Sequence, residues 1–210
     1  MSRAPILLIG AGGHARSCID VIELEGRFSV AGLIGLPHEV GSRVLGYSVL
    51  GTDDTLPSML GEFPTVFISI GQIETPEPRL RIFSLVQQWC RELPVIVSPR
   101  AYVSRHATLG AGTIVMHGAV VNAGARVGRN CIINSQALVE HDAAIADHCH
   151  IATAAVINGG VRIGEGTFVG SNSTVRQGVS IGERCLISMA QGVLSNCETG
   201  SSAPAPKRST

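Results

Sequence analysis

The sequence predicts a small parallel α/β domain followed by a parallel β-helix, and two patterns carry this prediction. From Val103 to Val193, every sixth residue is aliphatic at sixteen consecutive positions. Before residue 100, short apolar runs alternate instead with helical patterns. A period of six fits neither an α-helix nor an amphipathic strand, and it is typical of a β-helix in which three hexapeptides close one triangular coil.

The residues two positions before the aliphatic ones are mostly small, as at Ala119, Cys131 and Ala137. Because residues two apart in a strand share a face, both sets are expected to point into the helix. Sixteen hexapeptides make about five coils, stacked at roughly 4.8 Å. A sandwich with chance periodicity is the alternative, and the unbroken run argues against it.

Residues 1–98 are expected to form the α/β domain, because strand and helix patterns alternate there. Gly26 ends the first helix, and Thr52 with two following acidic residues predicts the N-cap of the second. Residues 99–196 are expected to form the β-helix, and residues 197–210, rich in Ser and Pro, a flexible tail. The expected strands are 6–9, 28–34, 47–50, 65–70 and 95–97, and the expected helices are 15–25, 53–60, and one from Pro76 or Pro78 to about Arg91.

The composition restricts the partners. Lys+Arg and Asp+Glu both number 16, so the net charge is zero, which argues against nucleic acid or an anionic membrane. Hydrophobic residues make up 45% of the chain, which predicts a folded core. No apolar run is long enough for a membrane span or a signal peptide, so a cytoplasmic protein is expected.

The six cysteines show no metal-binding spacing. Cys131 and Cys149 are three hexapeptides apart, which is one full coil, and Cys185 lies two coils further on. They are interpreted as stacked, buried, reduced thiols, with a disulfide ladder as the alternative.

A glycine-rich turn follows the first strand. Gly10, Gly12 and Ala15 match G-x-G-x-x-A, and His14 lies at the tip of the turn. A dinucleotide fold also needs an acidic residue after the second strand, where this chain has Gly35-Leu36, so NAD is disfavoured. The backbone N–H groups of the turn suit an anion such as a diphosphate, and a tight turn without a ligand is the alternative.

His141 is the best candidate for a general base. It lies two residues beyond Val139, which places it in an exposed turn, and Asp142 beside it can hold one ring nitrogen while the other stays free. A solvated histidine beside an acid by chance is the alternative. A zinc site is disfavoured, because His141, His148 and His150 lack the close spacing of a zinc-binding pair.

Gly-Ala-Gly-Gly-His at residues 10–14, followed by Ile-Ile-Asn-Ser (132–135) and Val-Glu-His-Asp (139–142), resembles one family. This family comprises bacterial sugar acetyltransferases, including UDP-4-amino-sugar N-acetyltransferases, perosamine N-acetyltransferases and sialic acid O-acetyltransferases. The resemblance covers about residues 4–194. It implies a Rossmann-like N-terminal domain, a left-handed β-helix of hexapeptide repeats, a homotrimer, and acetyl-CoA bound between adjacent copies.

The resemblance also implies roles for individual residues. His141 corresponds to the general base and Asp142 to its orienting partner, with no covalent intermediate and no metal. Acidic residues common in the family after the second strand are replaced here by Gly35-Leu36-Pro37-His38. The implied substrate-binding residues are Gly10, Gly12, Gly13, His14, Gly71 and Asn134, and the implied acetyl-CoA-binding residues are His150, Gly159, Ser171 and Met189.

The expected function is therefore acetyl-CoA-dependent N-acetylation of the 4-amino group of a nucleotide-linked 4-amino-4,6-dideoxy sugar. The alternatives are O-acetylation of a sugar of the sialic acid type, and a non-catalytic trimeric scaffold or sensor. Association into trimers is also expected from apolar residues between the corners of the β-helix. These are Val120, Ile132, Leu138 and Phe168.

Overall fold

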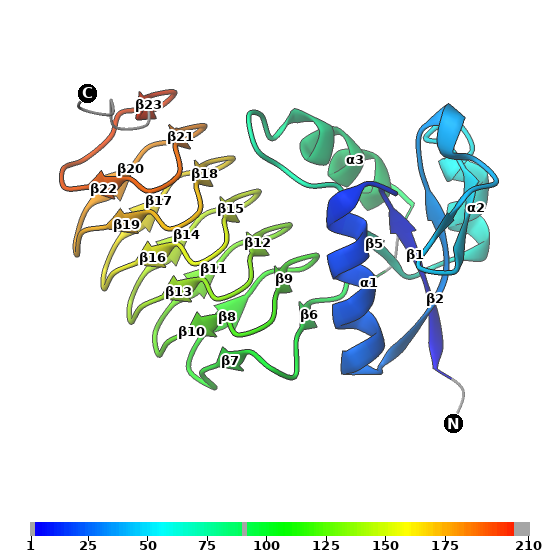
Figure 1. Cartoon of the computed structure of the whole chain (residues 1–210), viewed down its shortest axis with the longest axis horizontal. Coiled ribbons are helices and arrows are strands. Elements are labelled where there is room, and N and C mark those ends of the chain that lie inside the picture. The colour runs from blue at the N-terminus through cyan, green and yellow to red at the C-terminus, as the bar shows by residue number, and fades with distance from the viewer. Residues whose placement is uncertain (1–2, 90–91, 204–210) are drawn as a thin grey trace, which may run out of the picture. The chain divides into compact units, whose positions relative to one another are not determined.

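The computed structural model describes residues 3–89 and 92–203, and the chain divides into two compact units (Figure 1). The first unit comprises Met1–Gly71 and Glu77–Pro99, and the second comprises Gln72–Pro76 and Arg100–Thr210. The second unit thus includes a short segment from the N-terminal half of the chain, Gln72–Pro76, here called the strap. Within the described residues, no helix has the length and apolarity needed to span a bilayer.

The first unit is a five-stranded sheet in the order β3-β4-β2-β1-β5. All neighbouring strands are parallel except the β3–β4 pair, so the predicted parallel sheet is confirmed. The strands are β1 (Ala4–Ile9), β2 (Phe28–Ile34), β3 (Arg43–Val44), β4 (Tyr47–Gly51) and β5 (Val66–Ile68), and β6 (Ile96–Val97) follows later in the chain. The helices are α1 (Gly13–Glu25), α2 (Leu56–Glu62) and α3 (Glu77–Gln87), with a 3₁₀ turn η1 (Pro37–Glu39).

Helices cover both faces of this sheet (Figure 1). Leu7 and Ile9 of β1 pack with apolar residues of α2 and α3, and alternation along the strand turns Ile6 and Leu8 toward the other face, where α1 lies. Gly26 ends α1 in the left-handed conformation, with φ +78°, as expected.

The predicted start of the second helix is wrong. α2 begins at Leu56 and its N-cap is Thr55, not Thr52. Thr52 belongs to a separate turn. The Thr55 hydroxyl accepts a hydrogen bond from the Thr52 N–H and donates one to the Thr52 carbonyl. Pro57, the second helical residue, lacks an N–H and therefore fits only in the first turn, which fixes where α2 starts.

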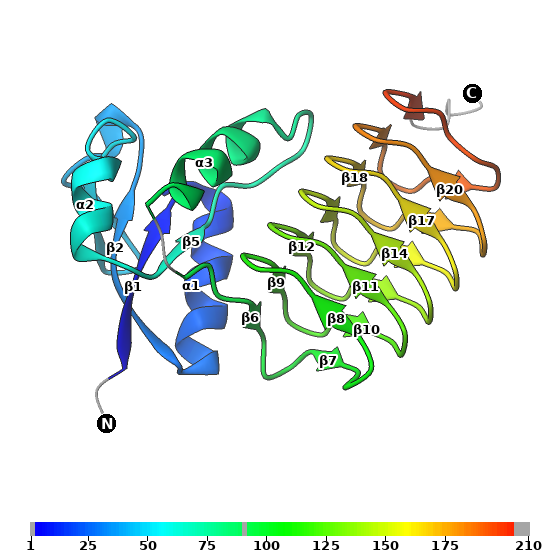
Figure 2. The ribbon, with the colours of Figure 1, turned by 180° about the vertical axis from the view of Figure 1, so that it is seen from behind.

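The second unit confirms the left-handed β-helix (Figures 1 and 2). Short strands form three parallel sheets, and each strand pairs with the one that lies three hexapeptides further along the chain, as Ile132 does with His150. The β7 face contains β7 (Tyr102–Val103), β10 (Val120–Val121), β13 (Leu138–Val139), β16 (Val156–Ile157), β19 (Thr174–Val175) and β22 (Gly192–Val193). The β8 face contains β8 (Thr108–Leu109), β11 (Arg126–Val127), β14 (Ala144–Ile145), β17 (Arg162–Ile163) and β20 (Ser180–Ile181). The β9 face includes β9 (Ile114–Val115), β12 (Ile132–Ile133), β15 (His150–Ile151), β18 (Phe168–Val169), β21 (Leu186–Ile187) and β23 (Ser202–Ala203).

Three kinds of corner connect these faces, and each is named here for one residue. The His141 corner leads from the β7 face to the β8 face, through residues such as 140–143. The His148 corner leads on to the β9 face, through residues such as 146–149. The Asn134 corner returns to the β7 face, through residues such as 134–137.

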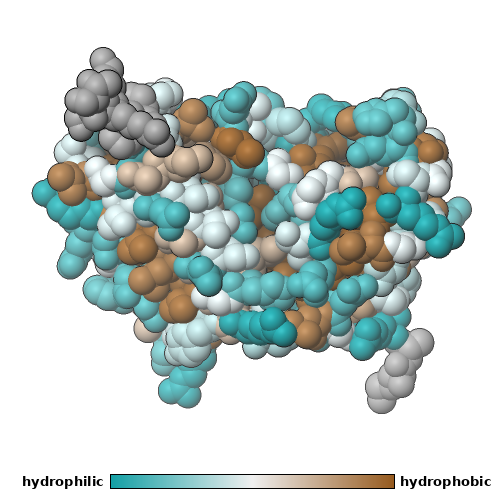
Figure 3. Space-filling model, viewed as in Figure 1, coloured by the Kyte–Doolittle hydropathy of each residue, from teal (hydrophilic) through white to brown (hydrophobic). Residues whose placement is uncertain are grey.

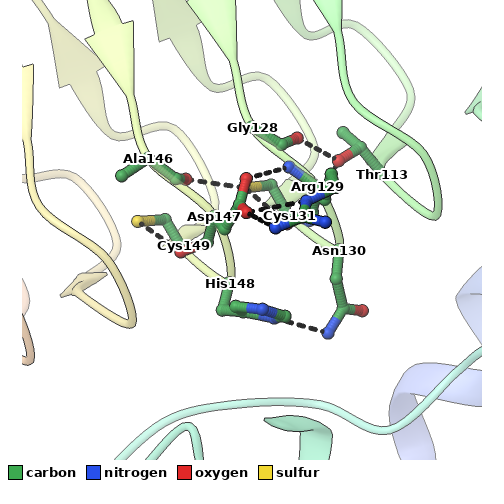
Figure 4. Close-up of polar contacts among 9 residues, drawn as sticks. All are labelled: Thr113, Gly128, Arg129, Asn130, Cys131, Ala146, Asp147, His148 and Cys149. Atoms are coloured by element: carbon green, nitrogen blue, oxygen red, sulfur yellow. Dashed lines mark hydrogen bonds and ion pairs between the residues drawn. The ribbon is translucent and has the colours of Figure 1, made fainter. Parts of the chain in front are cut away.

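Inside the His148 corner, polar side chains form a column with one member in each coil. Thr113 donates its hydroxyl to the Gly128 carbonyl at 2.7 Å, and its oxygen accepts the Cys131 N–H at 3.0 Å (Figure 4). Burial raises the pKa of the Cys149 thiol well above its usual value, so this thiol stays protonated as a donor. The column comprises Thr113, Cys131, Cys149, Thr167 and Cys185, and all three cysteines are free thiols.

The β-helix continues into the segment expected to be a flexible tail. β23 pairs with β21, and the Cys197 N–H bonds the Ser180 carbonyl. Asn196 accepts the Ser180 N–H through its side chain. Without these contacts the edge of the last coil would expose unpaired backbone groups, so pairing continues where the hexapeptide period stops. Residues 204–210 of the expected tail lie outside the described part of the chain.

We predict that Thr167→Val lowers the free energy of unfolding by about 2 kcal/mol, because it leaves a buried carbonyl and a buried N–H without their partner. The two side chains have nearly the same shape, so packing should be conserved. Thermal and urea unfolding at fixed protein concentration measure the change. Thr108→Val, at an exposed position on the β8 face, is the matched control, and equal losses in the two variants would contradict the prediction.

Candidate active site

His141 lies in the turn between β13 and β14 with its side chain 57% exposed, as its position in the repeat predicts. The ring Nδ1–H donates to the Asp142 carboxylate at 2.9 Å. This bond leaves Nε2 as the nitrogen that carries a lone pair in the neutral ring. The sequence prediction that Asp142 would hold one ring nitrogen therefore agrees with the geometry.

The hydrogen bond that His141 donates to Asp142 raises the pKa of His141, and the charges of Asp142 and Glu140 add to this effect. A group whose pKa is raised by folding stabilises the folded state while it is protonated. This stabilisation is present below the unfolded-state pKa and is lost as the pH rises through the folded-state pKa. The neutral imidazole, the form that can accept a proton, becomes abundant only above that raised value.

Glycines in the coils on either side make room for this pair. A Cβ on Gly159 would lie 2.6 Å from His141 Nε2, and a Cβ on Gly124 would lie 2.5 Å from an Asp142 carboxylate oxygen. Gly159 follows His141 by three hexapeptides and Gly124 precedes Asp142 by the same offset, so each glycine lies one coil away from the side chain it accommodates. Gly159 is thus next to the imidazole, where the sequence predicts an acetyl-CoA contact.

Asn134 and His150 form a second cluster at the Asn134 corner and the β9 face. Asn134 Nδ2 lies 3.0 Å from His150 Nε2, and His150 Nδ1 lies 2.5 Å from the main-chain oxygen of Gln72 in the strap. His150 is 7% exposed, and the edge of its ring meets Phe168 at a centroid distance of 5.2 Å. Both ring nitrogens are therefore engaged within the protein.

Ser171 and Met189 lie on the same corner as Asn134, one coil apart from each other. Met189 is 68% exposed and Ser171 is partly exposed. Apart from His150 on the β9 face, the predicted residues of this unit therefore separate into two groups, on the two corners that border the β7 face. His141, Asp142 and Gly159 occupy one corner, and Asn134, Ser171 and Met189 the other.

The glycine-rich turn lies at the carboxyl end of β1 in the first unit. Gly10, with φ +116°, could not carry a side chain, because a Cβ would lie 2.7 Å from Ile70 Cγ1. Gly12 caps α1 and Gly13 begins it, and a Cβ on either would meet no atom within 4 Å. Internal packing therefore does not require these two glycines, and the start of α1 is left open to an anion.

His14 and Gly71 are neighbours, as the sequence interpretation requires. A Cβ on Gly71 would lie 3.4 Å from His14 Cβ, so the loop after β5 flanks the glycine-rich turn. Four of the five predicted residues of this unit thus line the start of α1, and Gly10 forms the bend that leads to it.

An acidic residue that sequence reasoning missed lies beside this turn. Glu39, in η1, folds its carboxylate back to accept the Leu36 N–H at 2.8 Å. A Cβ on Gly35 would meet both Glu39 Oε2, at 2.8 Å, and the Ala11 side chain, at 3.1 Å. A carboxylate is therefore present at the end of β2 despite the absence of the expected acidic pair, and the 3₁₀ turn carries it there.

The His148 corner carries a further polar cluster, which Figure 4 shows beside the column of Thr113, Cys131 and Cys149. Arg129 and Asp147 form an ion pair at 2.6 Å, and Asn130 bonds His148 at 2.9 Å. Desolvation opposes ionisation of Asp147, but hydrogen bonds from Arg129 prevail and lower its pKa. Across residues 3–89 and 92–203, no three His, Cys, Asp or Glu side chains converge as a metal site.

Two other residues escaped the sequence interpretation. Gly124 could have been recognised from its offset of three hexapeptides from Asp142, since that offset marks stacked positions. Gln72 carries no comparable signal, because nothing in the pattern of residues 72–76 shows that they pack on the β-helix.

Comparisons with known proteins match both units. The model of the PglD N-terminal domain matches residues 5–84. The model of the bacterial transferase hexapeptide (six repeats) matches residues 106–141, and that of the hexapeptide repeat of succinyl-transferase matches residues 160–190. No curated protein sequence matches the chain.

Solved structures match almost the whole chain. PerB from Caulobacter crescentus, in complex with CoA and GDP-perosamine, is 30% identical with a TM-score of 0.87, over 94% of this chain and 92% of that one. A perosamine N-acetyltransferase variant from the same organism, with a histidine replaced by asparagine, is 29% identical with a TM-score of 0.89, over 96% and 94%. The acetyltransferase domain of PglB from Neisseria gonorrhoeae, in complex with acetyl coenzyme A, is 26% identical with a TM-score of 0.85, over 96% of each chain.

We predict that NMR titration of His141 will give a pKa above the ordinary histidine value of about 6.5, and that Asp142→Asn will lower it. The asparagine cannot supply the negative charge that stabilises the imidazolium. The exposed His38, whose neighbours differ, serves as an internal reference in both proteins. An unchanged titration of His141 in the variant would show that Asp142 does not hold the ring in solution.

Proposed function

Because this chain belongs to the bacterial sugar acetyltransferases that join a PglD-type N-terminal domain to hexapeptide repeats, we propose that it acetylates the amine of a nucleotide-linked 4-amino-4,6-dideoxy sugar. The chain is an acyltransferase that uses acetyl-CoA, and the proposal adds the acceptor group. The observation that carries it is the His141–Asp142 pair, an oriented base on an open corner of the β-helix. The relatives named as N-acetyltransferases support the choice of an amine.

In the proposed reaction, His141 Nε2 accepts a proton from the amine as its nitrogen attacks the thioester carbonyl. Asp142 keeps the proton of the neutral ring on Nδ1 and stabilises the imidazolium that forms. CoA leaves as a thiolate or takes the proton back from His141. No covalent enzyme intermediate is needed, because the amine attacks the thioester directly.

The Gly159 backbone is proposed to hold the carbonyl oxygen of the thioester. Gly159 lies within van der Waals reach of the His141 imidazole, so a thioester carbonyl bound to its backbone would be next to the base. A backbone N–H directed at a developing negative charge stabilises the transition state more than the ground state.

The first unit is proposed to bind the diphosphate of the acceptor. The open N-terminus of α1 at Gly12 and Gly13 offers backbone N–H groups to phosphate oxygens, and His14 and Gly71 flank it. Glu39 supplies an acceptor for nucleotide hydroxyl groups at the end of β2. PerB, which is named with GDP-perosamine, supports a nucleotide sugar as the acceptor.

A homotrimer is part of the proposal, and the separation of the two groups of residues on different corners supports it. The β7 face lies between the His141 and Asn134 corners, and its outward residues Val120, Leu138 and Val156 are apolar and half-buried. Apolar side chains gather on the left side of Figure 3, which draws the β-helix in the view of Figure 1. Packing three β7 faces around a threefold axis would bring the His141 corner of one copy to the Asn134 corner of the next. Ile132 and Phe168, also expected in the interface, lie on the β9 face instead.

The direct test is an assay of His141→Ala with acetyl-CoA and a panel of nucleotide-linked amino and hydroxy sugars. Loss of the base should lower kcat for the amino sugar by about 10²–10⁴-fold while acetyl-CoA still binds. Thiol release follows the reaction, and calorimetry follows binding. Wild-type turnover by the variant would exclude His141 as the base. Preference for a hydroxyl acceptor would indicate an O-acetyltransferase, and failure of the wild-type protein to bind acetyl-CoA would indicate a scaffold or sensor.

A second prediction tests the shared site. His141→Ala and Asn134→Ala homotrimers should each be impaired, but mixed trimers formed by co-expression should recover activity. Some of their sites pair an intact His141 corner with an intact Asn134 corner of the neighbouring copy. Sedimentation of each protein controls for assembly. Mixed trimers no more active than the better homotrimer would show that both corners act within one chain.

A further inference from the structure

The β8 face differs from the other two faces of the β-helix in the residues that it turns outward. The residue before each inward aliphatic position points out, because successive residues of a strand lie on opposite sides. On the described strands of the β7 and β9 faces, none of these outward residues is an arginine. On the β8 face, whose strands are labelled in Figure 2, two of them are, Arg126 and Arg162.

The two arginines flank Ala144 in the sheet. Arg126 pairs with Ala144 from the coil before, and Arg162 pairs with it from the coil after. The two arginine positions are thus roughly 9.6 Å apart, which is twice the usual strand spacing, and only a methyl group lies between them. Both arginines are exposed, and Ala144 is half-buried. Two long side chains can therefore converge on a ligand that lies over Ala144.

A groove of about 510 Å³ runs along this part of the β8 face. Small residues line it, among them Gly128, Ala144 and Gly164, and the two arginines and Ser180 border it as well. No bulky side chain of these positions fills the space between the guanidinium groups. A side chain longer than that of alanine at position 144 would occupy this space.

The charges of Arg126 and Arg162 are not neutralised within the described part of the chain. Neither forms an ion pair there, whereas three other arginines do, Arg27 with Glu25, Arg81 with Asp53 and Arg129 with Asp147. The described strands of the β8 face turn no Asp or Glu outward. A groove lined by charge of one sign concentrates counter-ions, and planar guanidinium groups bind phosphate oxygens through two parallel hydrogen bonds. The groove therefore fits a ligand that carries phosphate.

We propose that Arg126 and Arg162 bind a diphosphate group over Ala144, next to the corner that carries His141. β14 begins at Ala144, three residues after His141, so the proposed site and the base belong to one coil. Acetyl-CoA and a nucleotide-linked sugar both carry a diphosphate. The inference rests on the proposed function for the identity of these two ligands, and it adds the residues that hold one of them.

Ala144→Glu and Ala144→Gln are the sharpest pair of variants. The glutamate lies one coil from each arginine and can pair with both, so it should take the place of the diphosphate. It should raise the Kd of the ligand at least about tenfold, whereas the uncharged glutamine of the same size should raise it less than about threefold. Thermal unfolding checks that both variants fold.

Calorimetry with CoA, with GDP and with UDP identifies the ligand. The double variant Arg126→Gln, Arg162→Gln should raise the Kd of the ligand that uses the site at least about tenfold. The double lysine variant should keep part of the affinity, because lysine retains the charge without the planar fork. Arg3→Gln, which removes an exposed arginine of the first unit, is the matched control and should leave every Kd unchanged.

The pattern of losses assigns the site. A loss confined to CoA assigns it to the cosubstrate, and a loss confined to GDP or UDP assigns it to the acceptor. Unchanged Kd values in the double glutamine variant would overturn the proposal, as would equal losses in Ala144→Glu and Ala144→Gln, or a wild-type protein that binds none of the three.

These binding measurements do not require turnover. A protein that binds CoA through these arginines but acetylates no amino sugar would retain this inference and contradict the proposed function. Turnover of an amino sugar with Kd values that the variants leave unchanged would do the reverse.

Discussion

The backbone pairing between successive coils is the constraint on which the second unit depends. It fixes the register of all three faces, so a residue on one coil always meets the residues three hexapeptides before and after it. Parallel strands this short contribute little individually, and the stacking of successive coils supplies the continuous core. The polar column from Thr113 to Cys185 reinforces this stacking, because each of its side chains bonds backbone of a later part of the chain.

The same offset of three hexapeptides explains how His141 and Asp142 fit on their corner. His141 and Asp142 are neighbours in sequence, yet each needs space in a different coil, and Gly159 and Gly124 provide it. A larger residue at either position would displace the imidazole or the carboxylate while leaving the core intact. The chemistry on this corner is thus separable from the packing beneath it, as is common for sites on repeat folds.

The sequence predicted the β-helix well, because a period of six has one physical interpretation and its inward positions are apolar at every repeat. It also predicted that His141 is exposed, from its distance to Val139, and that Asp142 beside it can hold one ring nitrogen, as the structure has it. It did not predict Gln72 or Glu39. Their positions depend on a loop that packs on distant coils and on a 3₁₀ turn, and such contacts leave no period in the chain. His150 was recognised as important, but its burial and its contact with the strap depend on tertiary packing that the repeat alone does not specify.

Asp142 illustrates how the repeat and the chemistry constrain each other. Its position in the corner has φ +58°, and the equivalent position in the adjacent coils is held by Gly124, at +76°, and Gly160, at +64°. A side chain in the left-handed region costs roughly 1 kcal/mol, least for Asn and Asp. In the coil of His141 this cost is offset, because the left-handed turn directs the Asp142 carboxylate toward His141 Nδ1. A glycine would relieve the strain and remove the partner, so the residue at this position reflects the needs of the imidazole more than those of the turn.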